Sequence, residues 1–185
     1  MEILTALHNR VSMPRLVEPG PSDEQLTAIF QAALRAPDHA MLKPWRFLTI
    51  QEEGLNKLGQ LFADAARQDQ PDLSEEALQK YLGMPLRAPM VIVVICSPKE
   101  HPKVPEVEQL LSAGAATQNI LLACHGMGVG AMWRTGAMAY HPHVKAGLGL
   151  AESEILTGFI YLGTPQGTAK RLPLLTQSDF VREWS

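Results

Sequence analysis

Two short stretches of the chain carry side chains that could hold a phosphate. Arg10, Val11 and Ser12 stand at a chain bend just before Pro14, which breaks the helical pattern. Trp133-Arg134-Thr135 places an aromatic ring, a fixed cation and a hydroxyl where a strand pattern ends. Guanidinium groups and hydroxyls bind phosphate through charge-assisted hydrogen bonds. For residues 10–12 taken alone, a solvated basic turn is the alternative, and the sequence favours it.

A third stretch, Ala36–Phe47, joins a helical pattern to a strand pattern. Pro37 ends the helix, and the joint then carries an Asp, a His, a Lys and a Trp, a combination that a plain connection does not need. We interpret the joint as one wall of a binding pocket. Histidine titrates near neutral pH, so His39 could donate a proton there; ring packing or hydrogen bonding is the alternative role.

Other motifs point away from common site types. Gly126, Gly128 and Gly130 follow a helix and precede a strand, whereas a dinucleotide fingerprint follows a strand and opens a helix, so a helix C-cap and tight turn is the better interpretation. The pair His141 and His143 fits a solvated helix start better than a metal pair. No Ser-His-Asp order, P-loop or metal-type Cys/His spacing is present, and we predict neither a catalytic side chain nor a metal ligand.

The composition is that of a globular protein with one domain. Its 185 residues are 46% hydrophobic and 19% charged, which is enough to build a sizeable core. The net charge of −3 argues against a general nucleic-acid binder. We expect no signal peptide and no membrane span, since no apolar run reaches about 18 residues. Cys96 and Cys124 lie in apolar surroundings and are expected to be buried thiols, so the protein is predicted to be cytoplasmic.

Helices and strands alternate along the chain. The Pro/Gly-containing segment 17–21 reads as a connector, and Ser22 is a suitable N-cap for the helix that follows. The β-branched run Ala88–Cys96 suggests a central strand covered on both faces. Together the patterns predict an α+β sandwich in which helices cover both faces of a small sheet. Helices are expected at residues 2–9, 22–35, 54–66, 74–82, 106–127 and briefly from 141, and strands at 45–50, 88–96, 129–135 and 155–162.

Two segments suggest contacts beyond a single chain. Residues 112–124 are Ala-rich and nearly apolar all round, which is typical of a helix buried on most sides. The tail, about 166–185, has little periodicity, and its Phe180 and Trp184 could pack on a partner subunit. The polar stretch 68–73 is expected to be an excursion from the domain.

Taken in order, these stretches resemble one family across nearly the whole chain. Residues 10–12 look like the N-terminal Arg-x-Ser of nitroreductase-like flavoproteins, and Ala36–Phe47 is similar to their Ala-Pro-Ser…Gln-Pro-Trp-x-Phe joint. Residues 112–136 resemble their central helix, Gly-rich turn and next strand, and residues 158–165 their last core strand. The short length and the variants at 38–39 and 133–134 look most like the small YdjA-like branch of NAD(P)H nitroreductases.

The resemblance implies a single nitroreductase-like FMN-binding domain over residues 1–185, with a small mixed or antiparallel sheet, in an intertwined homodimer. Both chains would line each of two flavin sites. By the same match, Arg10, Ser12 and Arg134 would hold the phosphate, with Val11 between them. Trp133 and the backbone of Met132 would lie near phosphate and sugar. Arg35 and His39 would reach the ring or ribityl chain from the opposite subunit.

Three positions depart from the family pattern. Pro14 stands where many members have Arg or Lys, with Arg15 one residue later, and the joint has Asp38 for Ser and Lys43 for Gln. A cation beside flavin N1/O2 stabilises the reduced anionic flavin. Arg15 or Lys43 could supply that cation.

The activity implied by the resemblance is a ping-pong oxidoreductase. NADH or NADPH would give a hydride to flavin N5 and leave, and a small electron-poor acceptor such as a nitro compound or quinone would then take the electrons. One alternative is an FMN-binding protein of the same fold without reductase activity, such as a flavin carrier or flavin-processing protein. A more distant alternative is a helical interaction protein that binds no cofactor.

Overall fold

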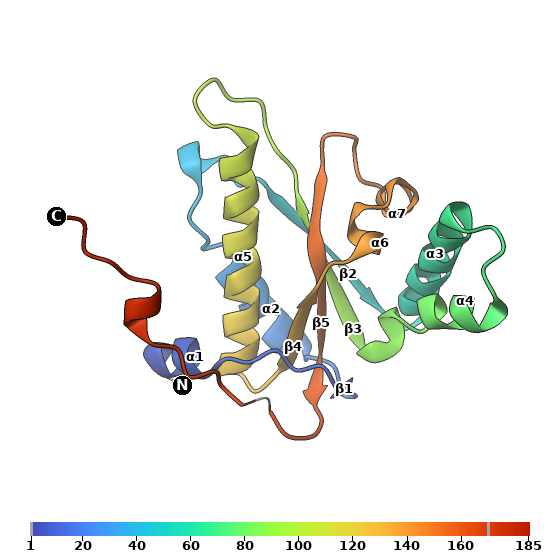
Figure 1. Cartoon of the computed structure of the whole chain (residues 1–185), viewed down its shortest axis with the longest axis horizontal. Helices are drawn as coiled ribbons and strands as arrows, with labels where there is room; N and C mark the ends of the chain where they lie inside the picture. The colour runs from blue at the N-terminus through green and yellow to red at the C-terminus, as the bar shows by residue number, and fades with distance from the viewer. Residues whose placement is uncertain (1, 170) are drawn as a thin grey trace.

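A five-stranded antiparallel sheet organises the chain, with helices on both of its faces (Figure 1). The computed structural model describes residues 2–169 and 171–185. The strands run in the order β1-β5-β3-β2, and β4 pairs with β5 as well, which confirms the expected α+β sandwich. Their bounds are β1 (Leu16–Val17), β2 (Trp45–Gln51), β3 (Met90–Cys96), β4 (Gly130–Arg134) and β5 (Ile155–Pro165).

Strand β3 is the buried centre that its apolar run predicted. Every residue from Met90 to Cys96 is buried, because β2 and β5 flank it and helices cover its two faces. On one face, Phe62 meets Phe159 edge-on at 5.2 Å between ring centroids, within a core that includes Val93. On the other face, Ile92 packs with Ile29 and Ile120.

Helices stand in two groups, one on each face of the sheet (Figure 1). The first group contains α2 (Asp23–Ala33) and α5 (Glu106–Gly126), and short α1 (Ile3–Asn9) contacts α5. The second group contains α3 (Glu53–Asp69), α4 (Glu75–Leu82), α6 (Ala137–Tyr140) and α7 (Pro142–Gly147). Short 3-10 turns complete the chain: η1 (His39–Met41), η2 (Pro85–Arg87) and η3 (Gln177–Asp179).

The start of α2 shows why the sequence begins a helix there. Ser22 Oγ accepts a hydrogen bond from the Gln25 backbone N–H at 3.2 Å, and Gln25 Oε1 accepts one from the Ser22 N–H at 2.9 Å. This reciprocal capping box satisfies two donors that a helix start leaves free. The predicted N-cap at Ser74 is also confirmed, since its hydroxyl accepts from Ala77 N.

Four local predictions differ from the structure. Leu16 and Val17 form strand β1, in which Leu16 pairs with Pro165 and Val17 with Thr164 of β5. The predicted connector 17–21 is therefore partly a strand. Strand β5 also continues through residues 163–165, where a closing turn was expected. Helix α3 runs on to Asp69, into the stretch expected to be an excursion. Helix α6 was not expected. Each of these differences is decided by pairing or packing with residues distant in sequence, and a local sequence pattern does not encode such contacts.

Helix α5 is enclosed over residues 112–124, as its composition predicted, and is exposed on one side before that stretch. Ala113, Ala116 and Ile120 are fully buried against the sheet and α2. On its other side Val107 and Leu111 are 61% and 68% exposed. Both of these residues precede the stretch 112–124, in which every residue except Gln118 is buried or half-buried, so the burial expected for that stretch is confirmed.

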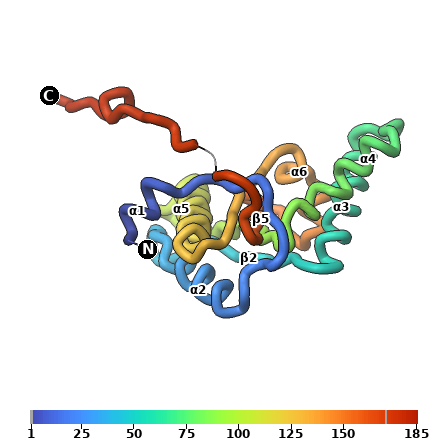
Figure 2. Tube along the Cα trace, turned by 90° about the horizontal axis from the view of Figure 1, so that it is seen from below, coloured from blue at the N-terminus to red at the C-terminus, as the bar shows by residue number. Residues whose placement is uncertain are grey.

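The C-terminal tail leaves the body of the molecule. Beyond β5 the described residues 166–169 and 171–185 are all exposed, and the tail extends away from the helices in two perpendicular views (Figures 1 and 2). Its apolar side chains face solvent, with Leu174 92% and Trp184 100% exposed.

A partly buried ion pair ties strand β2 to the loop before β5. Arg46 Nη2 lies 2.5 Å from Glu154 Oε2, and its Nε lies 2.6 Å from Oε1, a fork-to-fork contact. Glu154 also accepts a hydrogen bond from the Ala151 N–H at 2.9 Å. The Arg46 hydrogen bonds lower the pKa of the Glu154 carboxyl to about 2, so this carboxylate is held in its charged form.

Candidate flavin site

The two predicted phosphate-binding stretches lie beside each other. The Met13 N–H donates to the Ala131 carbonyl at 3.0 Å, which fixes the N-terminal segment against β4. Arg10 and Ser12, just before that hydrogen bond, are half-buried. The sheet therefore brings residues 10–12 to the strand that carries residues 132–134, although the two stretches are far apart in sequence.

Trp133 forms a wall at this end of β4. Its Nε1–H donates to the Thr157 carbonyl at 3.2 Å, and the indole lies against the backbone of Gly158. A Cβ at residue 158 would lie 2.1 Å from Trp133 Nε1 and 3.0 Å from the Arg134 carbonyl oxygen, so only glycine fits. The remaining 37% of Trp133 is exposed, which leaves the ring available to a ligand.

A cavity of about 490 Å³ opens at the end of β4. Its volume is in the range of sites that hold small molecules and cofactors. Apolar and aromatic groups dominate its walls, with two arginines among them. The lining comes from α3, α4, η2, β4, β5 and the start of α6: Phe62, Tyr81, Met84, Arg87, Met132, Trp133, Arg134, Thr135, Gly136, Ala137, Met138, Phe159 and Tyr161.

Arg134 lines this cavity and carries a hydrogen-bond donor, its buried Nε, that has no partner among the described residues. Its Cζ lies 5.4 Å from the centroid of the Tyr161 ring, which supports the cation by a cation–π contact. Burial lowers the pKa of Arg134, and the neighbouring charge of Arg87 lowers it further. An anion would relieve both effects, so the site fits a negatively charged cofactor.

Arg35 and His39 lie elsewhere, beside the N-terminal half of α5. Both are exposed, and His39 Nδ1 is 3.7 Å from Glu108 Oε2. His39 lines a shallower hollow of about 290 Å³ that also includes Leu111. A single subunit therefore does not bring these two residues to the cavity at β4.

The joint around His39 has an unusual backbone. Ala40, Met41 and Lys43 have positive φ angles of 55°, 55° and 49°, which are uncommon for residues with a side chain. Asp38 Oδ2 holds the turn by accepting a hydrogen bond from the Lys43 N–H at 2.7 Å. Such backbone conformations persist where the surroundings impose them and are frequent at ligand sites.

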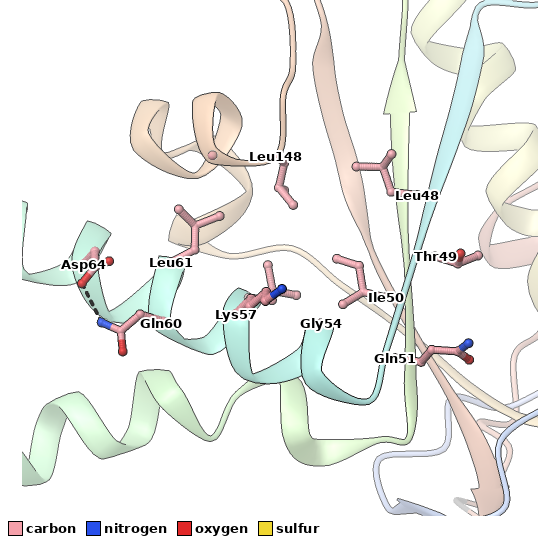
Figure 3. Close-up of a pocket in the computed structure, with 12 residues that line it drawn as sticks. Leu48, Thr49, Ile50, Gln51, Gly54, Lys57, Gln60, Leu61, Asp64 and Leu148 are labelled. Carbon is pink, nitrogen blue, oxygen red and sulfur yellow. Dashed lines mark hydrogen bonds between the residues drawn. The ribbon is translucent and has the colours of Figure 1, made fainter.

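A further, more open hollow contains none of the predicted site residues. It is a groove of about 690 Å³ between β2 and the helices α3 and α7 (Figure 3). Leu48 and Ile50 of β2 point toward Leu61 and Leu148 across it, and Lys57 and Asp64 supply its charges. The groove runs along β2, the outer strand of the sheet.

Arg87 is the charged residue of the cavity that sequence reasoning missed, together with apolar and aromatic lining residues such as Phe62 and Tyr161. Arg87 reaches the cavity from η2, a turn between α4 and β3, and it lies far from Arg134 in sequence. No motif surrounds it; the flanking Pro85 and Pro89 signal only a turn.

Other site types have little support in the described part of the chain. No group of three or more His, Cys, Asp or Glu side chains there could hold a metal ion. Cys96 and Cys124 are free and buried, as expected, and burial raises their pKa values to about 11 and about 12. Among the described helices, none has the length and apolar composition for crossing a membrane.

Comparison with known proteins gives a consistent result. A model of the Nitroreductase family matches residues 16–164. The "Putative NAD(P)H nitroreductase YdjA" of Escherichia coli strain K12 is 40% identical over 166 residues, covering 90% of each chain. A "Putative NAD(P)H nitroreductase" of Haemophilus influenzae is 38% identical over 185 residues, covering 98% of each. The crystal structure of "a putative nitroreductase in complex with FMN" from Desulfovibrio desulfuricans superposes with a TM-score of 0.75 at 25% identity, covering 100% of this chain and 98% of that one.

Proposed function

Because this chain belongs to the nitroreductase family, we propose that it is an FMN-dependent NAD(P)H oxidoreductase that reduces electron-poor acceptors such as nitro compounds or quinones. The cavity at the end of β4 carries the proposal. Its aromatic walls suit a flat ring, and the buried, unpartnered Nε of Arg134 suits an anionic cofactor.

We assign the cofactor to residues along β4 and the adjoining N-terminal segment. Arg10 and Ser12, with Val11 between them, anchor the phosphate, and Arg134 supplies a further cation. Met132 contributes backbone, and Trp133 packs against the sugar or ring. Held by these residues, FMN would supply hydride transfer between NADH or NADPH and the acceptor.

No side chain of the chain has to act as a nucleophile in this proposal. The residues around the cavity bind the cofactor, orient it and exclude water. The apolar walls from Phe62, Met84 and Met138 reduce water access, and Arg134 remains charged to hold an anion. We assign His39 of the partner subunit to packing or hydrogen bonding at the ring, with proton donation as the alternative role.

The proposed active form is a homodimer. Arg35 and His39 are assigned to the flavin site of the opposite subunit, since they do not reach the cavity of their own. Exposed apolar side chains support a large contact: Ile3 and Leu4 on α1 are 71% and 62% exposed, and Leu111 on α5 is 68% exposed. Exposed apolar groups concentrated on two neighbouring helices are typical of an interaction surface.

The C-terminal tail is proposed to pack on the partner along β2. That strand pairs with β3 on one side, so its other edge offers free backbone donors and acceptors. The groove beside it is lined by Leu48, Ile50 and Leu61 and would bury apolar tail residues such as Phe180 (Figure 3). An extended peptide that adds to a sheet edge in this way gains both hydrogen bonds and apolar burial.

The proposed compartment is the cytoplasm. The free thiols of Cys96 and Cys124 fit a reducing environment.

One experiment tests the function directly. The purified protein should show the absorption bands of bound FMN, and these should bleach on anaerobic addition of NADH or NADPH and return with a nitro compound or quinone. Colourless protein that takes up no added FMN would contradict the proposal. Yellow protein whose flavin NAD(P)H cannot reduce would instead favour a flavin carrier.

A further inference from the structure

We propose that Arg87 is a second cation of the flavin site, which faces bound FMN beside Arg134 and raises the reduction potential of the cofactor. This inference rests on the proposed function. Neither the phosphate-binding stretches nor the joint at Ala36–Phe47 contains this residue.

The backbone holds Arg87 at the cavity wall. It is the last residue of η2, whose first residue, Pro85, is buried, and the next residue, Ala88, is 3% exposed. Pro85 fixes its own φ angle, and Pro89 restricts the backbone of Ala88. The turn packs against α3, so the backbone of Arg87 belongs to a fixed part of the fold, and its exposed side chain reaches the cavity from there.

Two positive charges are held near one another without compensation. Arg87 and Arg134 both line the cavity, and neither forms an ion pair with a carboxylate among the described residues. The like charge of Arg87, whose side chain is exposed, lowers the pKa of Arg134, although less than burial does. Like charges at a partly apolar site repel each other, and a bound anion offsets that repulsion because it attracts both cations.

The position of Arg87 separates it from the proposed phosphate anchor. Met13, the residue after Ser12, hydrogen-bonds to Ala131 near the start of β4, whereas Arg87 and Arg134 line the cavity at the end of that strand. A strand advances about 3.3 Å per residue, so Ala131 and Arg134 are about 10 Å apart. FMN held by its phosphate at residues 10–12 and extending along the strand would bring its ring end to the two arginines. In this arrangement Arg134 lies at the ring, whereas the family resemblance placed it at the phosphate.

The ring gains negative charge when it is reduced at neutral pH. A cation beside it therefore favours the reduced form over the oxidised form and raises the potential. The two cations suggested by the sequence are not in this cavity. The Lys43 ammonium lies 3.4 Å from the Met41 carbonyl at the joint, and Arg15 lies near Gly167 beyond β5. Within the described part of this chain, Arg87 is the cation placed for the role together with Arg134.

The test compares the two-electron potential of bound FMN in Arg87→Gln and in the unaltered protein, by equilibration with a reference dye. We expect the variant to bind reduced FMN about tenfold less tightly relative to oxidised FMN, which corresponds to a potential lower by about 30 mV. Arg87→Lys should recover most of the difference because it keeps the charge. Arg87→Met, which keeps the apolar stem, replaces Arg87→Gln if that variant does not fold. Lys103→Gln, an exposed loop substitution with the same charge change, should leave the potential unaltered.

The outcomes separate this inference from the proposed function. A folded, yellow Arg87→Gln protein with the wild-type potential would overturn the role of Arg87 and leave the proposed function standing. The same potential with a raised KM for a carboxylate-bearing nitro acceptor would assign Arg87 to acceptor binding and also overturn it. Wild-type protein that takes up no FMN would remove the proposed function and this inference together.

Discussion

The indole of Trp133 lies against the bare backbone of Gly158, so closely that a Cβ at residue 158 would be 2.1 Å from Trp133 Nε1. This contact couples β5 to the wall of the proposed flavin site. Because residue 158 has no side chain, the Trp133 ring of the neighbouring strand can lie directly on its backbone.

Gly158→Ala should displace the Trp133 ring and weaken FMN binding while the sheet still forms. Overpacking of this kind costs about 1–3 kcal/mol of folding stability. FMN fluorescence titration measures the affinity, and near-UV circular dichroism reports the ring. Gly126→Ala is the control, because nothing lies within 4 Å of a Cβ at that exposed position at the end of α5. Equal loss of affinity in both variants would count against the Trp133 contact.

Arg134→Ala should weaken FMN binding by about 1.5–3 kcal/mol, the range for a hydrogen bond to a charged group. The physical reason is that the buried Nε has no other partner among the described residues. Fluorescence titration again gives the affinity. Arg67→Ala, which removes an exposed guanidinium 3.9 Å from Glu75, should bind FMN normally. Unchanged affinity in Arg134→Ala would remove Arg134 from the cofactor site.

Glu154→Gln should destabilise the fold by on the order of 2–4 kcal/mol at pH 7, since it removes half of a partly buried ion pair with Arg46. The folded pKa is lowered from 4.5 to about 2. The stabilisation is therefore present above about pH 4.5 and is lost as pH falls toward 2.

Urea unfolding at pH 7 and at pH 3 checks both parts of this prediction. The difference between wild type and Glu154→Gln should be smaller at pH 3. Glu75→Gln breaks an exposed contact with Arg67 and should cost less than about 1 kcal/mol at either pH. A difference that does not change with pH would show that the lost contact is not electrostatic.

Removal of the residues after Gly167 should convert the proposed dimer into monomers, because the tail carries apolar side chains that a single chain leaves in solvent. Analytical ultracentrifugation over a range of protein concentrations measures the change. Leu86→Ser, an exposed apolar position outside the tail, is the control and should leave the assembly as it is. A truncated protein that sediments as the full chain does would exclude the tail from the interface.

Much of the fold could be predicted from the sequence because its signals are local. Ser22 precedes acidic residues and a Gln three positions on, and the capping box forms as those types require. The run from Met90 to Cys96 has no polar residue, so it had to be the buried strand. Gly128, with a φ of 74°, follows α5 as the glycine of a helix end.

The remaining features depend on distant partners. Strand β1 has two residues, Leu16 and Val17, and no pattern of that length distinguishes it from a connector before β5 is in place. Arg87 reaches the site through a turn whose position is set by packing against α3. The site residues Arg35 and His39 stay assigned by family resemblance, since one chain does not carry both halves of the proposed site.

Strand β5 has a consequence for the order in which the protein can assemble during translation. It pairs with β1, β3 and β4, yet it is the last of the five strands to be synthesised. Before β5 emerges from the ribosome, the β2–β3 pair is the sheet contact that the described strands can make. The cavity includes Phe159 and Tyr161 of β5, so the nascent chain acquires a cofactor site only near the end of its synthesis.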